Sequence, residues 1–179
     1  DVPPQENPGV QLGLAMGIAG LEGRDKVTLF ASPDVADFGA WAEQLIAEST
    51  GKDGKGLVPI EGETIGDAAV YGNDRFFIDL RTEREHDAAH EAKLAALEAA
   101  GHPVVRIVMK SIDHIGQEFF RFEIATAVAG SILGINPFNQ PDVEAAKIKT
   151  RELTAAFEKT GALPAEQPVV SADGVELYT

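Results

Sequence analysis

A glutamine and a glutamate on one face of a predicted helix have the types and spacing that chemistry needs. Gln44 and Glu48 lie four residues apart, so their side chains project from the same side of the helix. Glu48 leads into the Gly-rich loop Gly51–Gly56, where a carboxylate can reach a bound ligand and work as an acid or base. Both residues also fit solvated polar positions at a helix end, and physical reasoning alone favours that interpretation.

The second stretch of interest runs from Asn136 to Lys147. A rigid turn places Gln140 at the start of a predicted helix, and Pro141 suits the first helical position. Lys147 lies about two helical turns further along. Taken alone, this pattern also describes an ordinary turn followed by a surface lysine, and physical reasoning alone favours that interpretation.

Together, the two stretches resemble the phosphoglucose isomerase family. Residues 48–52, Glu-Ser-Thr-Gly-Lys, are similar to the family's Glu-Ser-Asn-Gly-Lys, and residues 136–147 are similar to its closing signature Asn-x-Phe-Asp-Gln-x-x-Val-Glu-x-x-Lys. The motifs occur in the family's order, and the resemblance extends from about Asn7 to Lys159. The amino-acid sequence of the two stretches is most similar to bacterial short forms of the family, in particular to the isomerase half of bifunctional transaldolase/phosphoglucose isomerase proteins.

The resemblance implies an aldose–ketose isomerase that interconverts glucose 6-phosphate and fructose 6-phosphate. It implies that Glu48 is the base that moves a proton between C1 and C2 through a cis-enediol. It implies that Lys147 assists at the ring oxygen or stabilises the developing enediolate charge. Neither a metal nor an organic cofactor is implied. The resemblance also implies that four polar residues bind the substrate: Gln44, Ser49, Thr50 and Gln140.

Some positions depart from the family pattern. Asn139 stands where the closing signature has Asp, and residues 145–146 are Ala-Ala where it has Leu-Gly, but neither change removes a catalytic group. The family's ring-opening histidine has no counterpart in residues 62–71, which leaves His114 as a candidate substitute.

The resemblance also implies partners. The family's phosphate-binding Ser/Thr loop and catalytic Arg belong to a first sugar-isomerase (SIS) domain, which the sequence does not contain. We therefore expect an upstream N-terminal SIS domain and a homodimer, and we expect the polypeptide alone to be inactive or nearly so. The alternative is a non-catalytic SIS module that binds a sugar phosphate for regulation or assembly. Retention of Glu48 and Lys147 favours the enzyme.

Alternating strands and helices must position these residues. In such a chain we expect a doubly wound, mostly parallel α/β sheet with helices on both faces, and the resemblance implies the same three-layer αβα sandwich. Ligands of these sheets bind at the carboxyl ends of the strands. The predicted strands are Lys26–Ala31, Leu57–Ile60, Phe76–Leu80 and Val104–Val108. The predicted helices are Val10–Leu21, Ser32 to about Gly51, Glu83–Ala100, Gly116–Leu133 and Pro141 to about Lys159.

Bulk properties restrict the class of protein. Residues 1–8 are predicted to be a linker, residues 9–160 a C-terminal SIS domain and residues 161–179 an extended C-terminal arm. The net charge of −14, from 29 acidic and 15 basic residues, argues against nucleic acid and anionic membranes as partners. The absence of cysteine excludes disulfides and thiolate chemistry. Without a membrane-length apolar run or a signal-like start, a cytoplasmic location is the default expectation.

Two further patterns suggest ligands but have simpler explanations. His86 and His90 lie four residues apart on the predicted charged helix, where they could form a surface metal site, but a solvated face is the favoured interpretation. The loop Gly51–Gly56 lacks the Gly-x-x-x-x-Gly-Lys-Ser/Thr pattern and follows a helix rather than a strand. A nucleotide site there is therefore not expected.

Overall fold

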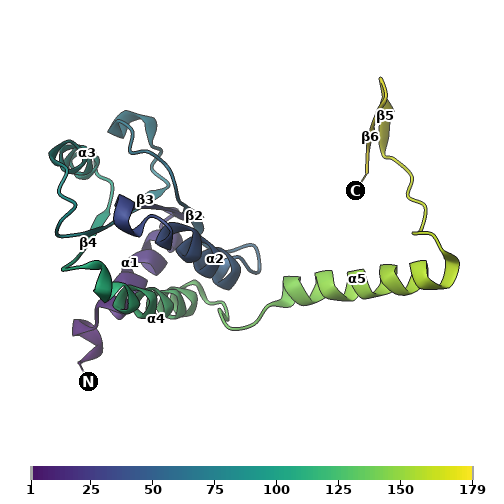
Figure 1. Cartoon of the computed structure of the whole chain (residues 1–179), viewed down its shortest axis with the longest axis horizontal. Helices are drawn as coiled ribbons and strands as arrows, with labels where there is room; N and C mark the ends of the chain where they lie inside the picture. Colours follow the sequence, from purple (N-terminus) through teal and green to yellow (C-terminus); the bar gives the residue numbers. More distant parts are fainter. Residues whose placement is uncertain (1, 179) are drawn as a thin grey trace. The chain divides into compact units, whose positions relative to one another are not determined.

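The computed structural model of the chain describes residues 2–178 (Figure 1). Its internal contacts group the residues into a first unit that ends at Asn139 and a second unit that begins at Gln140. The first residue of the predicted linker and the last residue of the predicted arm lie outside the described residues. The predicted domain boundaries at residues 8 and 160 stay predictions.

A parallel four-stranded sheet forms the centre of the first unit. In space the strands follow the order β2-β1-β3-β4, and every neighbouring pair is parallel. These strands are the runs of β-branched and aromatic residues that the sequence predicts, and their bounds differ from the prediction by at most two residues. The strands are β1 (Lys26–Ala31), β2 (Val58–Ile60), β3 (Arg75–Thr82) and β4 (Val104–Met109).

Helices cover both faces of this sheet (Figure 1). On one face pack α1 (Pro8–Leu21), α2 (Phe38–Thr50) and α4 (Ile115–Leu133), whereas α3 (Ala88–Ala99) packs on the other face. The predicted three-layer α/β fold class is therefore confirmed. Short 3₁₀ helices occupy Pro4–Glu6, Pro33–Val35, Ala68–Val70 and Ile112–His114.

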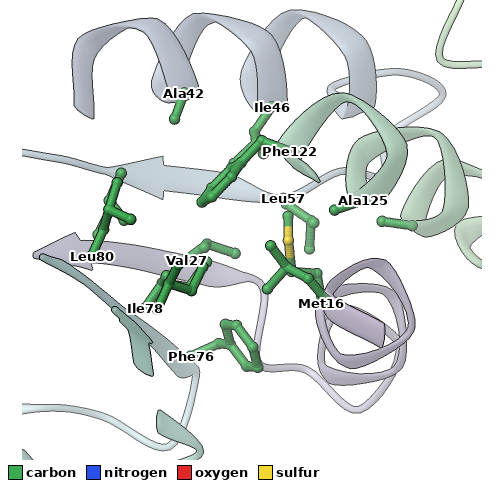
Figure 2. Packing of buried hydrophobic residues seen from close by; sticks show 14 of the residues in the cluster. Met16, Val27, Ala42, Ile46, Leu57, Phe76, Ile78, Leu80, Phe122 and Ala125 are labelled. Carbon is green, nitrogen blue, oxygen red and sulfur yellow. The ribbon is translucent and has the colours of Figure 1, made fainter. Parts of the chain in front are cut away.

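The larger core lies between the sheet and the helices α1, α2 and α4 (Figure 2). Successive side chains of a strand point to opposite faces, so Phe76, Ile78 and Leu80 of β3 enter this core while Phe77 enters the smaller core against α3. Each fully buried large apolar side chain stabilises the fold by about 1.5–3 kcal/mol. The helices contribute Met16 from α1, Ala42 and Ile46 from α2, and Phe122 and Ala125 from α4.

Helices α1 and α4 approach each other closely because glycines line one side of α1. Gly9, Gly13 and Gly17 recur at four-residue intervals, which places them on one face of the helix. A β-carbon added at Gly13 would lie 2.5 Å from the carbonyl oxygen of Ala125 and 2.7 Å from Cβ of Val128. The Gly-rich sequence of this helix therefore allows direct contact with the backbone of α4.

The charged helix after β3 begins later than predicted. The prediction placed its start at Glu83, but α3 begins at Ala88 and leaves His86 outside the helix. The reason is Asp87, whose extended backbone and carboxylate form the N-cap: Oδ1 accepts from the N–H groups of Ala89 (2.8 Å) and His90 (3.3 Å). These N–H groups also lower the pKa of the Asp87 carboxyl.

The second unit contains one long helix and a hairpin. Helix α5 spans Pro141–Thr160, close to its predicted bounds, and Gly161 ends it in the left-handed conformation (φ 73°). The predicted extended arm contains the antiparallel strands β5 (Val170–Ala172) and β6 (Val175–Leu177). Their two-residue loop is Asp173-Gly174, with φ of 50° and 80°, and Asp-Gly is a preferred pair for such a hairpin turn.

His102 is a buried titratable residue of the smaller core. Its ring meets the ring of Phe77 edge-on, with 5.4 Å between centroids, and lies 6.4 Å from the ring of Tyr71. Burial is the main cause that lowers the pKa of the imidazole, and the Arg24 guanidinium lowers it further. Folding therefore disfavours the protonated form of His102.

We expect the free energy of unfolding to fall as the pH drops through about 6.5, the usual histidine pKa. The unfolded chain then binds a proton at His102 more readily than the folded chain does, so protonation favours unfolding. Replacing His102→Phe should remove this part of the pH dependence in urea denaturation between about pH 5 and pH 8. His86→Gln, at an exposed position, should retain it. An unchanged pH dependence in His102→Phe would contradict the prediction.

Candidate functional site

The predicted catalytic segment lies where helix α2 ends. Glu48 is in the last turn of α2 and Gln44 is one turn earlier; both side chains are exposed, and Ser49 is half-buried. Helix α2 follows β1 and runs back along the sheet, so the chain after it meets the beginnings of β1 and β2: the N–H of Val58 donates to the carbonyl of Asp25 (2.8 Å). The segment therefore lies at the opposite edge of the sheet from the strand carboxyl ends, where the fold alone predicted the ligand.

Thr50 anchors this end of α2. Its side chain is fully buried, and its hydroxyl donates to the carbonyl of Ile46 (2.8 Å) while it accepts from the N–H of Leu57 (2.9 Å). These bonds tie the helix end to the chain that enters β2. Its assignment to substrate binding stays a prediction, and the hydroxyl already has backbone partners.

A buried lysine joins the two motif stretches. Lys52 is 5% exposed, and its ammonium donates to the carbonyl of Asn136 (2.8 Å) and to the carbonyl of Asn139. The neighbouring Lys55 donates to the carbonyl of Leu133 (3.1 Å), at the end of α4. Residues more than eighty positions apart in the sequence thus meet at one cation, within the first unit.

The loop around Lys52 is shaped for this contact. The N–H of Lys55 donates to the carbonyl of Lys52 (2.9 Å), and the N–H of Lys52 donates to the carbonyl of Lys55 (3.2 Å). These two bonds close a tight turn. Asp53 and Gly54 adopt positive φ values of 56° and 69°, as such a turn requires. No local pattern in the sequence indicates that Lys52 is buried; the available signal was its place in the motif directly after Gly51.

The turn that Lys52 contacts has its own fixed geometry. Helix α4 ends at Leu133, and the next residue, Gly134, caps it in the left-handed conformation (φ 69°). The side-chain oxygen of Asn136 accepts from the N–H of Phe138 (3.0 Å), which forms an Asx-type turn. The sequence-predicted residues Gln140, the N-cap of α5, and Lys147, exposed on α5, belong to the second unit. The structure thus brings the segment of Glu48 to the turn that precedes Gln140.

We expect Lys52→Met to loosen this turn. The substitution keeps most of the side-chain volume but removes two charge-assisted hydrogen bonds, so it should lower the free energy of unfolding by about 1–3 kcal/mol. Hydrogen exchange of the backbone amides of Asn136, Phe138 and Asn139 should become faster. Lys55→Met, at an exposed lysine with one such bond, is the matched control and should have a smaller effect. Unchanged exchange at the same backbone amides in Lys52→Met would contradict the role assigned to this ammonium.

The histidines that the sequence singled out have other environments. His86 is exposed and outside the helix, whereas Nε2 of His90 lies 2.7 Å from Oδ1 of Asp79, so the predicted pair on one helix face is wrong. Within residues 2–178, no group of three or more acidic or histidine side chains is arranged to hold a metal ion. His114 precedes α4 at the carboxyl edge of the sheet, which argues against its reaching a sugar at Glu48 of the same copy.

The fold and this motif geometry together define a class: a parallel α/β domain with a carboxylate at the end of its second helix. A comparison with solved structures finds the same fold in a hypothetical protein from Thermus thermophilus. The TM-score is 0.68 at 19% sequence identity, over 86% of this chain and 46% of that chain. No family model matches the sequence. In the described part of the chain, no helix has the length and apolar character needed to cross a membrane.

Curated relatives narrow the class further. The chain is 30% identical to the glucose-6-phosphate isomerase of Lactobacillus delbrueckii subsp. bulgaricus over 165 residues, which are 72% of this chain and 36% of that protein. It is 32% identical to a probable glucose-6-phosphate isomerase of Halobacterium salinarum, over 65% and 35% of the two chains. It is 27% identical to the glucose-6-phosphate isomerase of Enterococcus faecalis, over 88% of this chain and 42% of that protein. All three relatives are named as glucose-6-phosphate isomerases, and the chain spans between 35% and 42% of their length.

Proposed function

We propose that this chain is the C-terminal SIS half of a glucose-6-phosphate isomerase and contributes one side of its active site. The observation that supports this most is the contact of Lys52 with Asn136 and Asn139. It joins the two segments that resemble the isomerase motifs, although they are far apart in the sequence. The names of the curated relatives agree with the same activity.

In this proposal Glu48 is the base of the isomerisation. After the sugar ring opens, its carboxylate takes the proton from the carbon next to the carbonyl group and returns it to the neighbouring carbon, through a cis-enediol. The exposed position of Glu48 at the helix end leaves its carboxylate accessible to a sugar. The ammonium of Lys147 stabilises the negative charge that develops on the enediolate oxygen. No metal or organic cofactor takes part in this mechanism.

The remaining predicted residues hold the substrate. Gln44 lies one helical turn before Glu48 on the same face, so both can contact one sugar. Ser49 and Gln140 supply further hydrogen-bonding groups for its hydroxyls. Thr50 contributes through the helix end that its hydroxyl anchors, and direct contact with the substrate would require it to exchange a backbone partner.

The proposal includes a second half of the site on other chain segments. An upstream N-terminal SIS domain supplies the phosphate-binding loop, and a homodimer completes the enzyme, in the cytoplasm. A transaldolase fused upstream is part of the same proposal, because the sequences of the two motifs are most similar to those of such fusion proteins. The acidic chain itself takes neither nucleic acid nor membrane as a partner, since it carries an excess of 14 negative charges.

A coupled assay for conversion of fructose 6-phosphate to glucose 6-phosphate tests the proposal. It compares this chain alone, its proposed N-terminal half alone, and a mixture of both. Activity in the mixture, with little or none in either part, is the expected result. If both parts fold and associate but the mixture is inactive, a non-catalytic module that binds a sugar phosphate becomes the better account.

A further inference from the structure

Two adjoining cavities open at the carboxyl ends of β1 and β3. The larger has a volume of about 470 Å³ and lies among β1, residues 61–65 and α3. The smaller, of about 290 Å³, lies where β1 and β3 end. Ala31, Asp87 and His90 line both, so the two form one depression with two lobes. The depression is at the opposite edge of the sheet from the segment of Glu48, and this edge is where parallel α/β sheets commonly bind ligands.

One wall of the smaller lobe has unused hydrogen-bonding capacity. The side chain of Asp79 is 3% exposed; its Oδ1 lies 2.7 Å from Nε2 of His90, and its Oδ2 lies 3.5 Å from Nε of Arg81. Among the described residues, neither this Oδ2 nor the buried Nη1 of Arg81 has a hydrogen-bond partner. Buried polar atoms in proteins are nearly always hydrogen-bonded, so these two point to a group that the depression receives.

A hydroxyl group matches this pair of atoms. It can donate to the carboxylate of Asp79 and accept from the guanidinium of Arg81, whereas a phosphate oxygen would meet the carboxylate as a second anion. Over both lobes the lining carboxylates outnumber the permanent cations, five against three (Arg81, Arg84 and Lys93), which also disfavours an anion. The ammonium of Lys93 is moreover bonded to the carbonyl of Ile65 (2.8 Å).

The position of His90 adds a fixed polar group between the two lobes. Asp79 orients its imidazole through Nε2, and the ring packs edge-on against Phe30, with 5.8 Å between the centroids. A ligand that spans the two lobes therefore contacts the Asp79 carboxylate, the Arg81 guanidinium and the His90 imidazole. Apolar side chains such as Leu29 and Ala31 lie beside these groups. Several hydroxyls on a small carbon skeleton suit this mixture of groups.

We propose that this depression is a second ligand site, which binds an unphosphorylated sugar or polyol. The site uses none of the residues assigned to the isomerase reaction. Its test is therefore independent of the test of the proposed function.

An NMR titration of the chain with glucose, myo-inositol, glucose 6-phosphate and inorganic phosphate tests the proposal. For glucose or myo-inositol we expect saturable amide shifts near Ala31, Asp87 and His90, with a weak Kd of about 1–10 mM. Inorganic phosphate should not produce these shifts. The proposal is overturned if the neutral compounds cause no saturable shift there, or if phosphate causes the same shifts. Shifts from glucose 6-phosphate confined to residues 44–52 would report on the isomerase site instead.

Two variants sharpen the test. Asp79→Asn keeps the shape but replaces the acceptor carboxylate, so the affinity for the neutral compound should fall at least about tenfold. Ala89→Trp, at an exposed position lining the larger lobe, should reduce binding by occupying that lobe, and it serves even if Asp79→Asn fails to fold. Glu48→Gln, at the other edge of the sheet, should bind the neutral compound normally. Normal binding by folded Asp79→Asn would overturn the assignment.

Discussion

Glu48→Gln in the assembled isomerase is expected to lower kcat by about 10²–10⁴-fold and to leave fructose 6-phosphate binding largely intact. The amide has the size and hydrogen-bonding reach of the carboxylate but cannot accept the proton that the reaction moves. Glu48 is exposed in the last turn of α2, and the amide matches the carboxylate in size, so we expect the fold to be retained. Turnover would be measured by the coupled assay, and binding by calorimetry with fructose 6-phosphate.

Glu43→Gln provides the matched control. Glu43 is on the same helix, is equally an exposed carboxylate, and has no assigned role in the reaction. It should retain nearly full activity, since removing one negative charge there changes only the general electrostatic field. If Glu48→Gln loses binding and rate in equal measure, Glu48 contributes to holding the substrate rather than to proton transfer.

Gly13→Ala is expected to destabilise the first unit strongly, although alanine normally favours a helix by about 1 kcal/mol over glycine. The added methyl group would lie 2.5 Å from the carbonyl oxygen of Ala125, which is backbone and cannot rotate away. Helices α1 and α4 would have to move apart and would lose packing along their whole contact. Overpacking of this kind costs about 1–3 kcal/mol beyond the propensity gain. Urea denaturation followed by circular dichroism measures the difference.

Gly116→Ala tests whether space, rather than helix propensity, decides the result. Gly116 is the second residue of α4, and a β-carbon there would meet no atom within 4 Å. This variant should be neutral or more stable by up to about 1 kcal/mol, because alanine loses less backbone entropy on folding. Equal stability of Gly13→Ala and wild type would show that the two helices can separate without cost.

The parts of the fold that depend on local pattern were predictable. The run from Lys26 to Ala31 forms a strand with the predicted bounds, because β-branched and aromatic residues between polar turns favour that conformation. The start of α3 was not predictable from its charges, since charged residues stand on both sides of Asp87. Only the capping geometry of Asp87, which depends on the backbone around it, decides where the helix begins.

The candidate site was predictable in its residues but not in its arrangement. The motif resemblance singled out Glu48, but its place at the amino edge of the sheet follows from the direction of α2 after β1. Lys52 has no local signal of burial, because a lysine becomes buried only where distant carbonyls gather around its ammonium. Asp79 was missed for the same reason: its partner His90 meets it only after β3 and α3 pack together.

The two outer strands of the sheet differ in how readily another chain could extend it. Within residues 2–178, β2 and β4 each pair with a strand on one side only. Strand β2 has three residues, one of them Pro59, which lacks an N–H group, so it is a poor template for a further strand. Strand β4 has six residues and no proline, and Val108 on it is 48% exposed. We expect strand addition, in native assembly or in aggregation at high concentration, to occur along β4.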